Sequence, residues 1–353
     1  MGHHHFLLKA LELANERRGF CSPNPSVGAV VVKNNEIIAT GYHYGPGYDH
    51  AEVAASQQLS NFEDASLYVT LEPCCHWGKT PPCTDMILNK GIKAVYYGYL
   101  DPNPLVAGQG AQLLQSQGVR CEQISLPEIN AFYKSYSHWV QTHRPWVTTK
   151  LAMSLDSKIA DLMSNPVSIT GQIAGLFTHQ SRKKSDAILT SVRTIIQDDP
   201  SLNIRLGDRV IAKPLYVIDS KVEFPPSAKL MQTAAKITVF YSEGEPSKIK
   251  TLEELGITCH PVSQSIGHLH LGEILDKIGD DGVHDLWVEA GGKVFSAFAS
   301  QQLAQKSFIY IAPKLLGKRA LPAFNEDRDI FSEAKAIKWQ NMGEDVVCEI
   351  DWE

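Results

Sequence analysis

The stretch SLYVTLEPCCHWGKTPPC, residues 66–83, decides the fold of the N-terminal part of the chain. Its apolar, strand-like start ends at Leu71, and prolines and cysteines follow at once. Upstream, His50-Ala51-Glu52 opens the helix-like segment HAEVAASQQL. Pro73-Cys74 is predicted to open a second helix, and Cys83 follows after eight residues. The pattern therefore predicts two helix starts that converge on one point.

The residues at this point have the chemistry of a catalytic metal site. We predict that the imidazole of His50 and the thiolates of Cys74 and Cys83 bind one Zn²⁺, leaving a fourth tetrahedral position for water. Glu52 is predicted to carry the proton from that water, as the non-ligand Glu does in zinc deaminases of pattern H-x-E and P-C-x-x-C. A helix N-terminus would favour the thiolate at Cys74. Cys75 is left out, because adjacent residues at a helix start point in different directions.

Three other interpretations of this pattern stay open. The zinc site could be structural, or the module could bind a partner without catalysis. In the third, His50 and Glu52 cap a surface helix and the cysteines are buried apolar residues. Removal of the carboxylate distinguishes catalysis from these alternatives.

Further from this stretch, strands and helices alternate. Residues 6–18 have helical spacing and stop at Gly19, and residues 27–43 predict a hairpin around Asn34-Asn35. A strand is expected at 94–99, and an amphipathic helix in 127–146, closed by Arg144-Pro145. Further strands are expected at 146–153, 186–190, 214–219, 237–241, 284–290 and 307–312. The sequence predicts two α/β domains, 1–144 and 145–353.

Composition excludes several function classes. The net charge is −6, which disfavours long nucleic acid as a partner, and no apolar run approaches the about 18 residues of a membrane span. The chain has seven cysteines, an odd number, and no secretory signal was found, so a disulfide framework is not expected. We expect a cytoplasmic protein. The histidines at positions 3–5 are placed at a mobile terminus and are given no function.

The stretches PNPSVGAVV, DHAEVAA, TLEPCCHWGKTPPCTD and DPNPLVAGQG resemble the bifunctional riboflavin-biosynthesis deaminase–reductase family, and the resemblance runs through both domains. It implies a cytidine-deaminase-like α/β/α sandwich followed by a dihydrofolate-reductase-like α/β domain. It also implies a diaminopyrimidinone substrate that carries a ribose 5-phosphate, and a homo-oligomer, dimer or tetramer. The family pattern carries over as substrate contacts at Asn24, His43, His76 and Lys79. An asparagine can offer both a donor and an acceptor to a pyrimidine edge, and a lysine suits a phosphate.

In the second domain KLAMSLDSKIA, TIIQDDPSLNIR, VEAGGKVFSAF and YIAPKLLG carry the resemblance, which implies that NADPH reduces the ribosyl group to ribityl by hydride transfer at C1′. Lys150, Asp198 and Glu289 are predicted for sugar contact and proton transfer. The further substrate contacts are Arg182, Leu202 and Arg205, the arginines binding phosphate. The predicted NADPH contacts are Ala152, Ser168, Thr194, Asp198, Ser220, Gly291, Gly292, Lys293, Val294 and Phe295. Gly291-Gly292 lets a backbone approach a phosphate closely, and the following helix start offers N–H groups.

The sequence departs from the family pattern at two positions of the second domain. Ser168 stands where the family usually has Trp, and Gly175 replaces a common arginine. Loss of an aromatic face beside the nicotinamide would weaken cofactor binding, so a deaminase with a weakened or inactive reductase is the alternative. A polynucleotide deaminase is a further alternative, which would need a basic groove and stacking aromatics.

Overall fold

A computed structural model describes residues 2–78, 80–104, 106–160, 169–265, 268–324 and 329–353. Two of the predicted site residues, Lys79 and Ser168, lie outside these ranges. The chain divides into two compact units, residues 1–144 and 145–353, which are described separately below. Within the described ranges, no helix is both long and apolar enough to cross a membrane.

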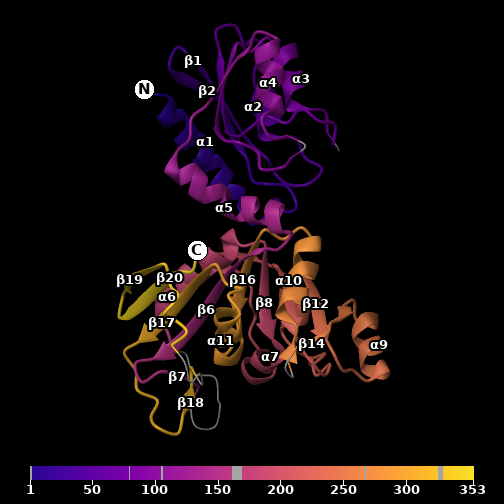
Figure 1. The fold of residues 1–353 in the computed structure, drawn as a ribbon, viewed down its shortest axis with the longest axis vertical. Helices are drawn as coiled ribbons and strands as arrows, with labels where there is room; N and C mark the ends of the chain where they lie inside the picture. Colours follow the sequence, from indigo (N-terminus) through magenta and orange to yellow (C-terminus); the bar gives the residue numbers. More distant parts are fainter. Residues whose placement is uncertain (1, 79, 105, 161–168, 266–267, 325–328) are drawn as a thin grey trace. The chain divides into compact units, whose positions relative to one another are not determined.

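The first unit is built on a five-stranded sheet with the strand order β2-β1-β3-β4-β5 (Figure 1). β1 pairs antiparallel with β2 and with β3, whereas β3, β4 and β5 run parallel. The strands are β1 (Gly28–Lys33), β2 (Glu36–Tyr42), β3 (Ser66–Leu71), β4 (Ala94–Tyr99) and β5 (Arg120–Gln123). The helices are α1 (His3–Arg17), α2 (Ala51–Ser56), α3 (Cys83–Asn89), α4 (Gln109–Ser116) and α5 (Pro127–Thr142).

Both faces of this sheet are covered, because its strands alternate two sets of apolar side chains. In β1, Val30 and Val32 pack in a cluster with α1 and α5. Ala29 and Val31 point to the opposite face and pack in a cluster with α2, α3 and α4. The predicted α/β/α sandwich is therefore confirmed for this unit.

Local signals set the ends of several elements. The expected hairpin turn at Asn34-Asn35 is confirmed, since both residues have positive φ, 50° and 66°. The histidines at positions 3–5 were expected at a mobile terminus, and this placement is wrong. They lie in α1, and Nδ1 of His3 lies 2.8 Å from the hydroxyl of Tyr68.

The predicted helix start at Pro73-Cys74 is also wrong. Residues 72–82 form no helix where the structure describes them, and α3 begins at Cys83. Pro82 is the N-cap of α3, which fits the preference of proline for helix starts. Two helix starts do meet at the predicted site, because His50 is the N-cap of α2 and Cys83 is the first residue of α3.

The second unit contains a nine-stranded sheet with the order β13-β12-β11-β8-β16-β6-β17-β20-β19. It is parallel from β13 to β17, and β20 and β19 extend it antiparallel. Its strands are β6 (Trp146–Ser154), β8 (Ala187–Ser191), β11 (Pro214–Ile218), β12 (Lys236–Tyr241), β13 (Thr258–Pro261), β16 (Asp285–Glu289), β17 (Lys306–Ala312), β19 (Ala336–Met342) and β20 (Asp345–Asp351). Short pairs are β7 (Lys158–Ala160) with β18 (Leu321–Pro322), β9 (Ile204–Leu206) with β10 (Arg209–Ile211), and β14 (Gln264–Ser265) with β15 (His268–Leu269).

Helices pack on both faces of this larger sheet. They are α6 (Gln172–Lys184), α7 (Val192–Asp198), α8 (Leu230–Thr233), α9 (Pro246–Glu254), α10 (Leu271–Asp280) and α11 (Gly292–Ser300). One core cluster joins the sheet to α6, α7, α8 and α9, and another joins it to α10 and α11. All six strands expected in this unit are present. Because β6, β8, β11 and β16 run parallel, the residues that follow them gather at one edge of the sheet, where ligands bind in open α/β sheets.

Candidate functional site

One point in the first unit brings a nitrogen and two sulfurs together. The ligand atoms of His50, Cys74 and Cys83 all lie within 4.8 Å of one another. Nδ1 of His50 is 3.5 Å from Sγ of Cys74 and 3.3 Å from Sγ of Cys83. One imidazole and two thiolates are the donors that a catalytic zinc site uses, so the residues present fit Zn²⁺. Cys75 is not part of this group.

The surroundings of Cys74 favour its thiolate. Its Sγ interacts with the thiol of Cys83, with the imidazole of His50 and with the backbone N–H of Cys83, which lies 3.4 Å away. Together they lower the pKa of Cys74 to about 4, against the opposing effect of burial. The start of α3 thus stabilises this thiolate, although Cys74 itself lies outside any helix.

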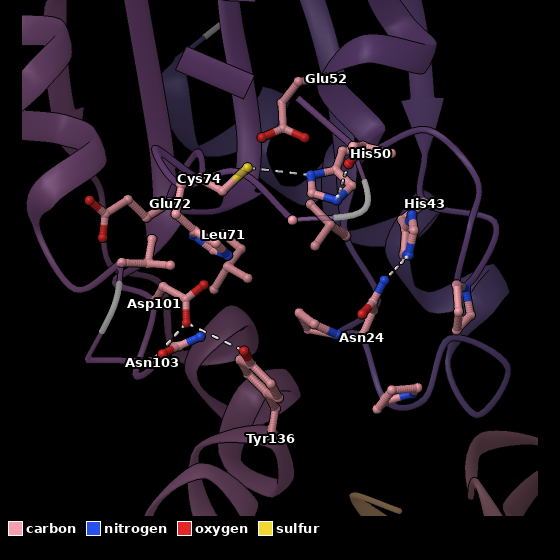
Figure 2. A pocket seen from close by; sticks show the side chains of 18 of the residues that line it. Asn24, His43, His50, Glu52, Leu71, Glu72, Cys74, Asp101, Asn103 and Tyr136 are labelled. Atoms are coloured by element: carbon pink, nitrogen blue, oxygen red, sulfur yellow. Dashed lines mark hydrogen bonds between the residues drawn. The ribbon is translucent and has the colours of Figure 1, made fainter. Parts of the chain in front are cut away.

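Glu52 lies in the first turn of α2, two residues after His50 (Figure 2). Its side chain is buried, and burial raises the pKa of its carboxyl, while the neighbouring His50 acts in the opposite direction. It also interacts with Cys83, a member of the predicted ligand set. A buried carboxyl with a raised pKa beside a metal site suits proton transfer.

Asn24 and His43 form a pair at the edge of the same pocket. Nδ1 of His43 lies 3.0 Å from the carbonyl oxygen of Asp49, which can only accept, so this nitrogen carries the proton. Nε2 therefore accepts from Nδ2 of Asn24, at 3.0 Å. The amide oxygen of Asn24 is left to face the pocket as an acceptor (Figure 2). His43 is buried, lines the pocket and has both ring nitrogens engaged, by Asn24 and by the carbonyl of Asp49.

The loop between the two cysteines supplies further lining. His76 is exposed and lines the pocket, together with Gly78 and Thr80. Lys79 belongs to the same loop but is not among the described residues. Of the predicted substrate contacts in this unit, the structure therefore brings Asn24, His43 and His76 to one pocket.

Sequence analysis missed Asp101, Asn103 and Tyr136, which line the opposite wall of the pocket (Figure 2). Oδ1 of Asp101 accepts from the backbone N–H of Asn103 at 2.9 Å and from the hydroxyl of Tyr136 at 3.4 Å. Burial raises the pKa of Asp101 to about 6. The stretch DPNPLVAGQG was recognised as a family motif, but nothing local in it shows that it meets α5.

Glu72 fixes this second wall to the strand end that precedes Cys74. Its carboxylate is buried and accepts from the backbone N–H of Gly108 at 2.8 Å and of Ala111 at 3.0 Å. A Cβ at Gly110 would lie only 2.0 Å from the carbonyl oxygen of Pro73. The start of α4 therefore packs closely against the metal-bearing segment.

In the second unit, a buried ion-pair cluster joins β6, β16 and α6. Arg182 donates to both carboxylate oxygens of Glu289, at 2.6 and 2.9 Å, and to the carbonyl of Asn203 at 2.8 Å. Nζ of Lys150 lies 4.0 Å from the same carboxylate. Burial opposes the charge of Glu289, yet the guanidinium lowers its pKa to about 2. Burial also lowers the pKa of Lys150.

The other predicted substrate contacts lie in different settings. Arg182 is buried and its guanidinium is engaged by protein groups, whereas Arg205 is exposed and held by Oδ1 of Asn203 at 2.8 Å. The side chain of Leu202 is in the core, so only its backbone, with φ of 41°, can meet a ligand. Asp198 is exposed at the last residue of α7 and is not brought into the Lys150–Glu289 cluster.

A second pocket lies between α7 and α11, at the carboxyl ends of β8 and β16. Five of the predicted cofactor contacts line it: Thr194, Gly291, Gly292, Lys293 and Val294. Arg193, which sequence analysis did not select, lines it as well, and none of the described lining residues is acidic. Two cations and the backbone at the start of α11 fit a phosphate-bearing cofactor.

The other predicted cofactor contacts that the structure describes, Ala152, Asp198, Ser220 and Phe295, do not line this pocket. The side chain of Phe295 is packed in the core, which explains why it does not reach the pocket. Ala152 is in β6 and Ser220 follows β11, and neither is among the residues that line it. Ser168 is outside the described residues.

Together, the two units define a class of protein: a deaminase with a His-Cys-Cys metal site, followed by an α/β unit with a pocket whose lining fits a phosphate. Comparison with known families agrees with both halves. Residues 1–99 match the cytidine and deoxycytidylate deaminase zinc-binding region, and residues 145–348 match the RibD C-terminal domain.

Relatives match the chain over nearly its whole length. The riboflavin biosynthesis protein RibD of Aquifex aeolicus is 35% identical over 97% of this chain and 96% of its own. Solved structures of RibD from Acinetobacter baumannii and of a deaminase/reductase from Thermotoga maritima superpose with TM-scores of 0.86 and 0.84. Each of these two is 30% identical and covers 99% of this chain and 98% of its own. The chain belongs to the RibD family of riboflavin biosynthesis proteins.

Membership settles the coarse activities predicted from the sequence. The chain is a deaminase and a reductase, with a cytidine-deaminase-like domain and a dihydrofolate-reductase-like domain. Its cofactors are zinc and NADPH. A reductase of yeast riboflavin biosynthesis, 18% identical with a TM-score of 0.50 over 64% of this chain, shares the fold of the second half.

Proposed function

We propose that the chain converts the diaminopyrimidinone bearing ribosylamino 5′-phosphate to its uracil analogue, releasing ammonia, and then reduces the ribosyl group to ribityl. The Thermotoga maritima relative is described as a diaminohydroxyphosphoribosylaminopyrimidine deaminase and 5-amino-6-(5-phosphoribosylamino)uracil reductase. The observation that carries the first step is the cluster of His50, Cys74 and Cys83 with the buried Glu52 beside it.

For the deamination, zinc held by His50, Cys74 and Cys83 supplies Lewis-acid activation of water. Glu52 takes up the protons of the attacking water in turn and delivers one to the ring nitrogen and one to the leaving amine. The bond between the ring carbon and its exocyclic amino nitrogen breaks, a C=O bond replaces it, and ammonia leaves. The amide oxygen of Asn24, oriented by His43, accepts an N–H of the pyrimidine edge. His76 and Lys79 are proposed to contact the ribose phosphate.

For the reduction, NADPH supplies the hydride that is transferred to C1′. Arg193, Thr194, Lys293 and the backbone at 291–294 are proposed to hold its phosphates, because they line one pocket without acidic neighbours. Lys150, beside Glu289, is proposed to contact the sugar and to donate a proton from Nζ. Burial lowers the pKa of this amine, which eases proton release. Arg205, the exposed arginine, is proposed as the main phosphate contact.

Glu52→Gln tests the deaminase proposal directly. The amide keeps the size of the side chain but cannot take up the proton, so ammonia release should fall by about 10²-fold or more. Zinc content, measured by elemental analysis, should stay at the wild-type value. Glu36→Gln, an exposed glutamate in β2, is the matched control and should leave both unchanged. Wild-type ammonia release by Glu52→Gln would contradict the proposal.

We also propose a cytoplasmic homo-oligomer. All seven cysteines are free thiols in this structure, including the pair Cys74 and Cys83 that a disulfide would remove from metal binding. The proposed dimer or tetramer rests on the family resemblance, and light scattering of the purified full-length chain tests it.

A further inference from the structure

The loop between Cys74 and Cys83 returns to the far side of the metal-site histidine. Thr80, close to the end of this loop, is half-buried and lines the deaminase pocket. Its Oγ1 lies 3.4 Å from Nε2 of His50. None of the roles assigned above uses this contact.

The position of the two sulfurs determines the tautomer of His50. Nδ1 faces Sγ of both Cys74 and Cys83, at 3.5 and 3.3 Å, so Nδ1 is the atom that would bind zinc. A ligand nitrogen must offer its lone pair, and a neutral imidazole has a single N–H. The proton must therefore be on Nε2, which then needs an acceptor.

Thr80 is the described group in position to be that acceptor. The nearby ring of His43 lies 5.4 Å from His50 between centroids, edge to face, and its own two nitrogens are engaged by Asn24 and by the carbonyl of Asp49. A hydroxyl oxygen can accept one hydrogen bond while donating its own proton elsewhere.

The chain around Thr80 restricts where its hydroxyl can point. The backbone carbonyl of Thr80 accepts from the backbone N–H of Gly78 at 3.3 Å. Pro81 and Pro82 follow and fix their own φ angles, and Pro82 is the N-cap of α3. Thr80 is thus restrained by this hydrogen bond and by the two prolines that lead into α3.

We propose that Thr80 is a positioning residue of the metal centre: its hydroxyl accepts the Nε2–H of His50 and so fixes the tautomer and the ring orientation that bind zinc. Outer partners of this kind hold metal-binding histidines in many sites, usually through a carboxylate, a backbone carbonyl or water. The inference rests on the proposed ligand set His50, Cys74 and Cys83.

This role also accounts for the length of the loop between Cys74 and Cys83. The compact deaminase pattern C-x-x-C leaves two residues between its cysteines. Here eight residues separate Cys74 from Cys83, and the last three of them are Thr80 and two prolines. The longer loop therefore brings an additional polar side chain back onto His50, besides lining the pocket with His76.

Zinc affinity of the full-length protein tests the proposal. Thr80→Val keeps the shape of the side chain and removes the acceptor, and its zinc dissociation constant, measured by chelator competition, should rise by about 10- to 100-fold. Thr80→Ser keeps a hydroxyl and should restore most of the affinity. Thr80→Ala should behave like Thr80→Val, which excludes an effect of the extra methyl group.

A matched control separates positioning from packing. Thr84, in the first turn of α3, is buried, and its Oγ1 has no hydrogen-bond partner among the described residues. Thr84→Val should leave zinc affinity unchanged. The Co²⁺-substituted enzyme gives a second measurement, since Thr80→Val should alter its visible absorption and Thr80→Ser should not.

The outcomes distinguish this proposal from the one on which it rests. Wild-type zinc affinity in Thr80→Val, or an equal loss in Thr84→Val, overturns the role of Thr80. Cys74→Ser is the reference for the ligand set and should lose far more affinity than any Thr80 variant. Wild-type zinc affinity in Cys74→Ser would instead show that the ligand set itself is wrong.

Discussion

Asp101 is a titratable residue of the deaminase pocket, and its sequence neighbours do not suggest that it is buried. It stands between Leu100 and Pro102 in a loop, yet it is 6% exposed and contacts Tyr136 of α5. Burial raises its pKa to about 6, so its negative charge is disfavoured in the folded state.

Asp101→Asn should change how stability depends on pH. Below about pH 4 the aspartate is protonated in both the folded and the unfolded chain, and no penalty exists. As the pH rises to about 6, only the unfolded chain ionises freely, so the free energy of unfolding of the wild-type protein falls by up to about 3 kcal/mol. The asparagine variant keeps an acceptor oxygen and does not titrate, so its stability relative to wild type should rise over this range.

Hydrogen exchange of peptides from residues 1–144 in urea, at pH 4 to 7, measures this difference in the full-length chain. A variant-minus-wild-type difference that is constant with pH would show that Asp101 is charged at no cost in the fold.

Arg182 provides the corresponding prediction in the reductase unit. Arg182→Met removes the guanidinium that holds Glu289 and leaves a buried carboxylate with Lys150 at 4.0 Å as its nearest cation. Loss of one partner of a buried pair costs about 3–5 kcal/mol. The double variant Arg182→Met/Glu289→Gln should recover part of this stability, because the buried carboxylate that lost its guanidinium is then absent.

Urea unfolding of the second unit, monitored by tryptophan fluorescence, measures the free energy of unfolding of both Arg182 variants. Equal stability of the single and the double variant would mean that the pair is not coupled.

The chemistry of a site could be predicted from the sequence where its residues are close together in the chain. His50, Glu52, Cys74 and Cys83 have a recognisable spacing, and the structure brings their side chains together. The wall formed by Asp101 and Tyr136 was not predicted, because these residues are 35 positions apart and meet only through the packing of α5 on the sheet. Arg193 was missed for the same reason, since its pocket needs α11 beside α7.

At the level of elements, glycine placement controls how closely two segments approach. The pair Gly291-Gly292 was interpreted as a place where the backbone approaches a phosphate. The two glycines have different surroundings in the structure. A Cβ at Gly292 would lie 1.8 Å from the carbonyl oxygen of Ala323. A Cβ at Gly291 would meet only a side-chain atom of Ile159, at 3.9 Å. Gly292 is therefore required for packing of α11, and both glycines border the proposed cofactor pocket.

Gly292→Ala should displace the first turn of α11 and so weaken NADPH binding. Overpacking of this kind costs about 1–3 kcal/mol or more. A fluorescence titration with NADPH and thermal unfolding of the full chain measure the two effects. Gly175→Ala, in the interior of α6 where nothing lies within 4 Å, is the control and should stabilise the protein by about 0.5–1 kcal/mol. Unchanged NADPH affinity in Gly292→Ala would show that the backbone of α11 does not set the pocket.

Element boundaries were predictable where turn residues are specific. Asn34 and Asn35 accept positive φ, and the hairpin forms where they stand. The helix expected at Pro73-Cys74 was misplaced because a proline was given too much weight; Pro82, directly before Cys83, is the one that caps α3. The antiparallel strands β19 and β20 were not predicted. The edge strand β19 lacks an apolar face, since its side chains are exposed at every position except the last.

For the molecule as a whole, the two activities should be separable. Each unit has its own core, and each candidate site is built from residues of one unit only. A substitution inside one site therefore leaves the other intact. This independence makes a complementation experiment with two full-length variants informative.

Glu52→Gln should release no ammonia from the diaminopyrimidine phosphate but should still oxidise NADPH with the deaminated compound as substrate. Lys150→Met should show the reverse, because the amine at the sugar site is gone and the metal site is unchanged. A mixture of the two variants should convert the diamino compound to the ribityl product, since the deaminated intermediate made by one molecule can diffuse to the reductase site of another. Ammonia and NADPH assays with chromatography of the product follow all three reactions. If each variant works alone but the mixture forms no ribityl product, the intermediate does not pass through solution, and the two sites depend on each other more than their separate cores suggest.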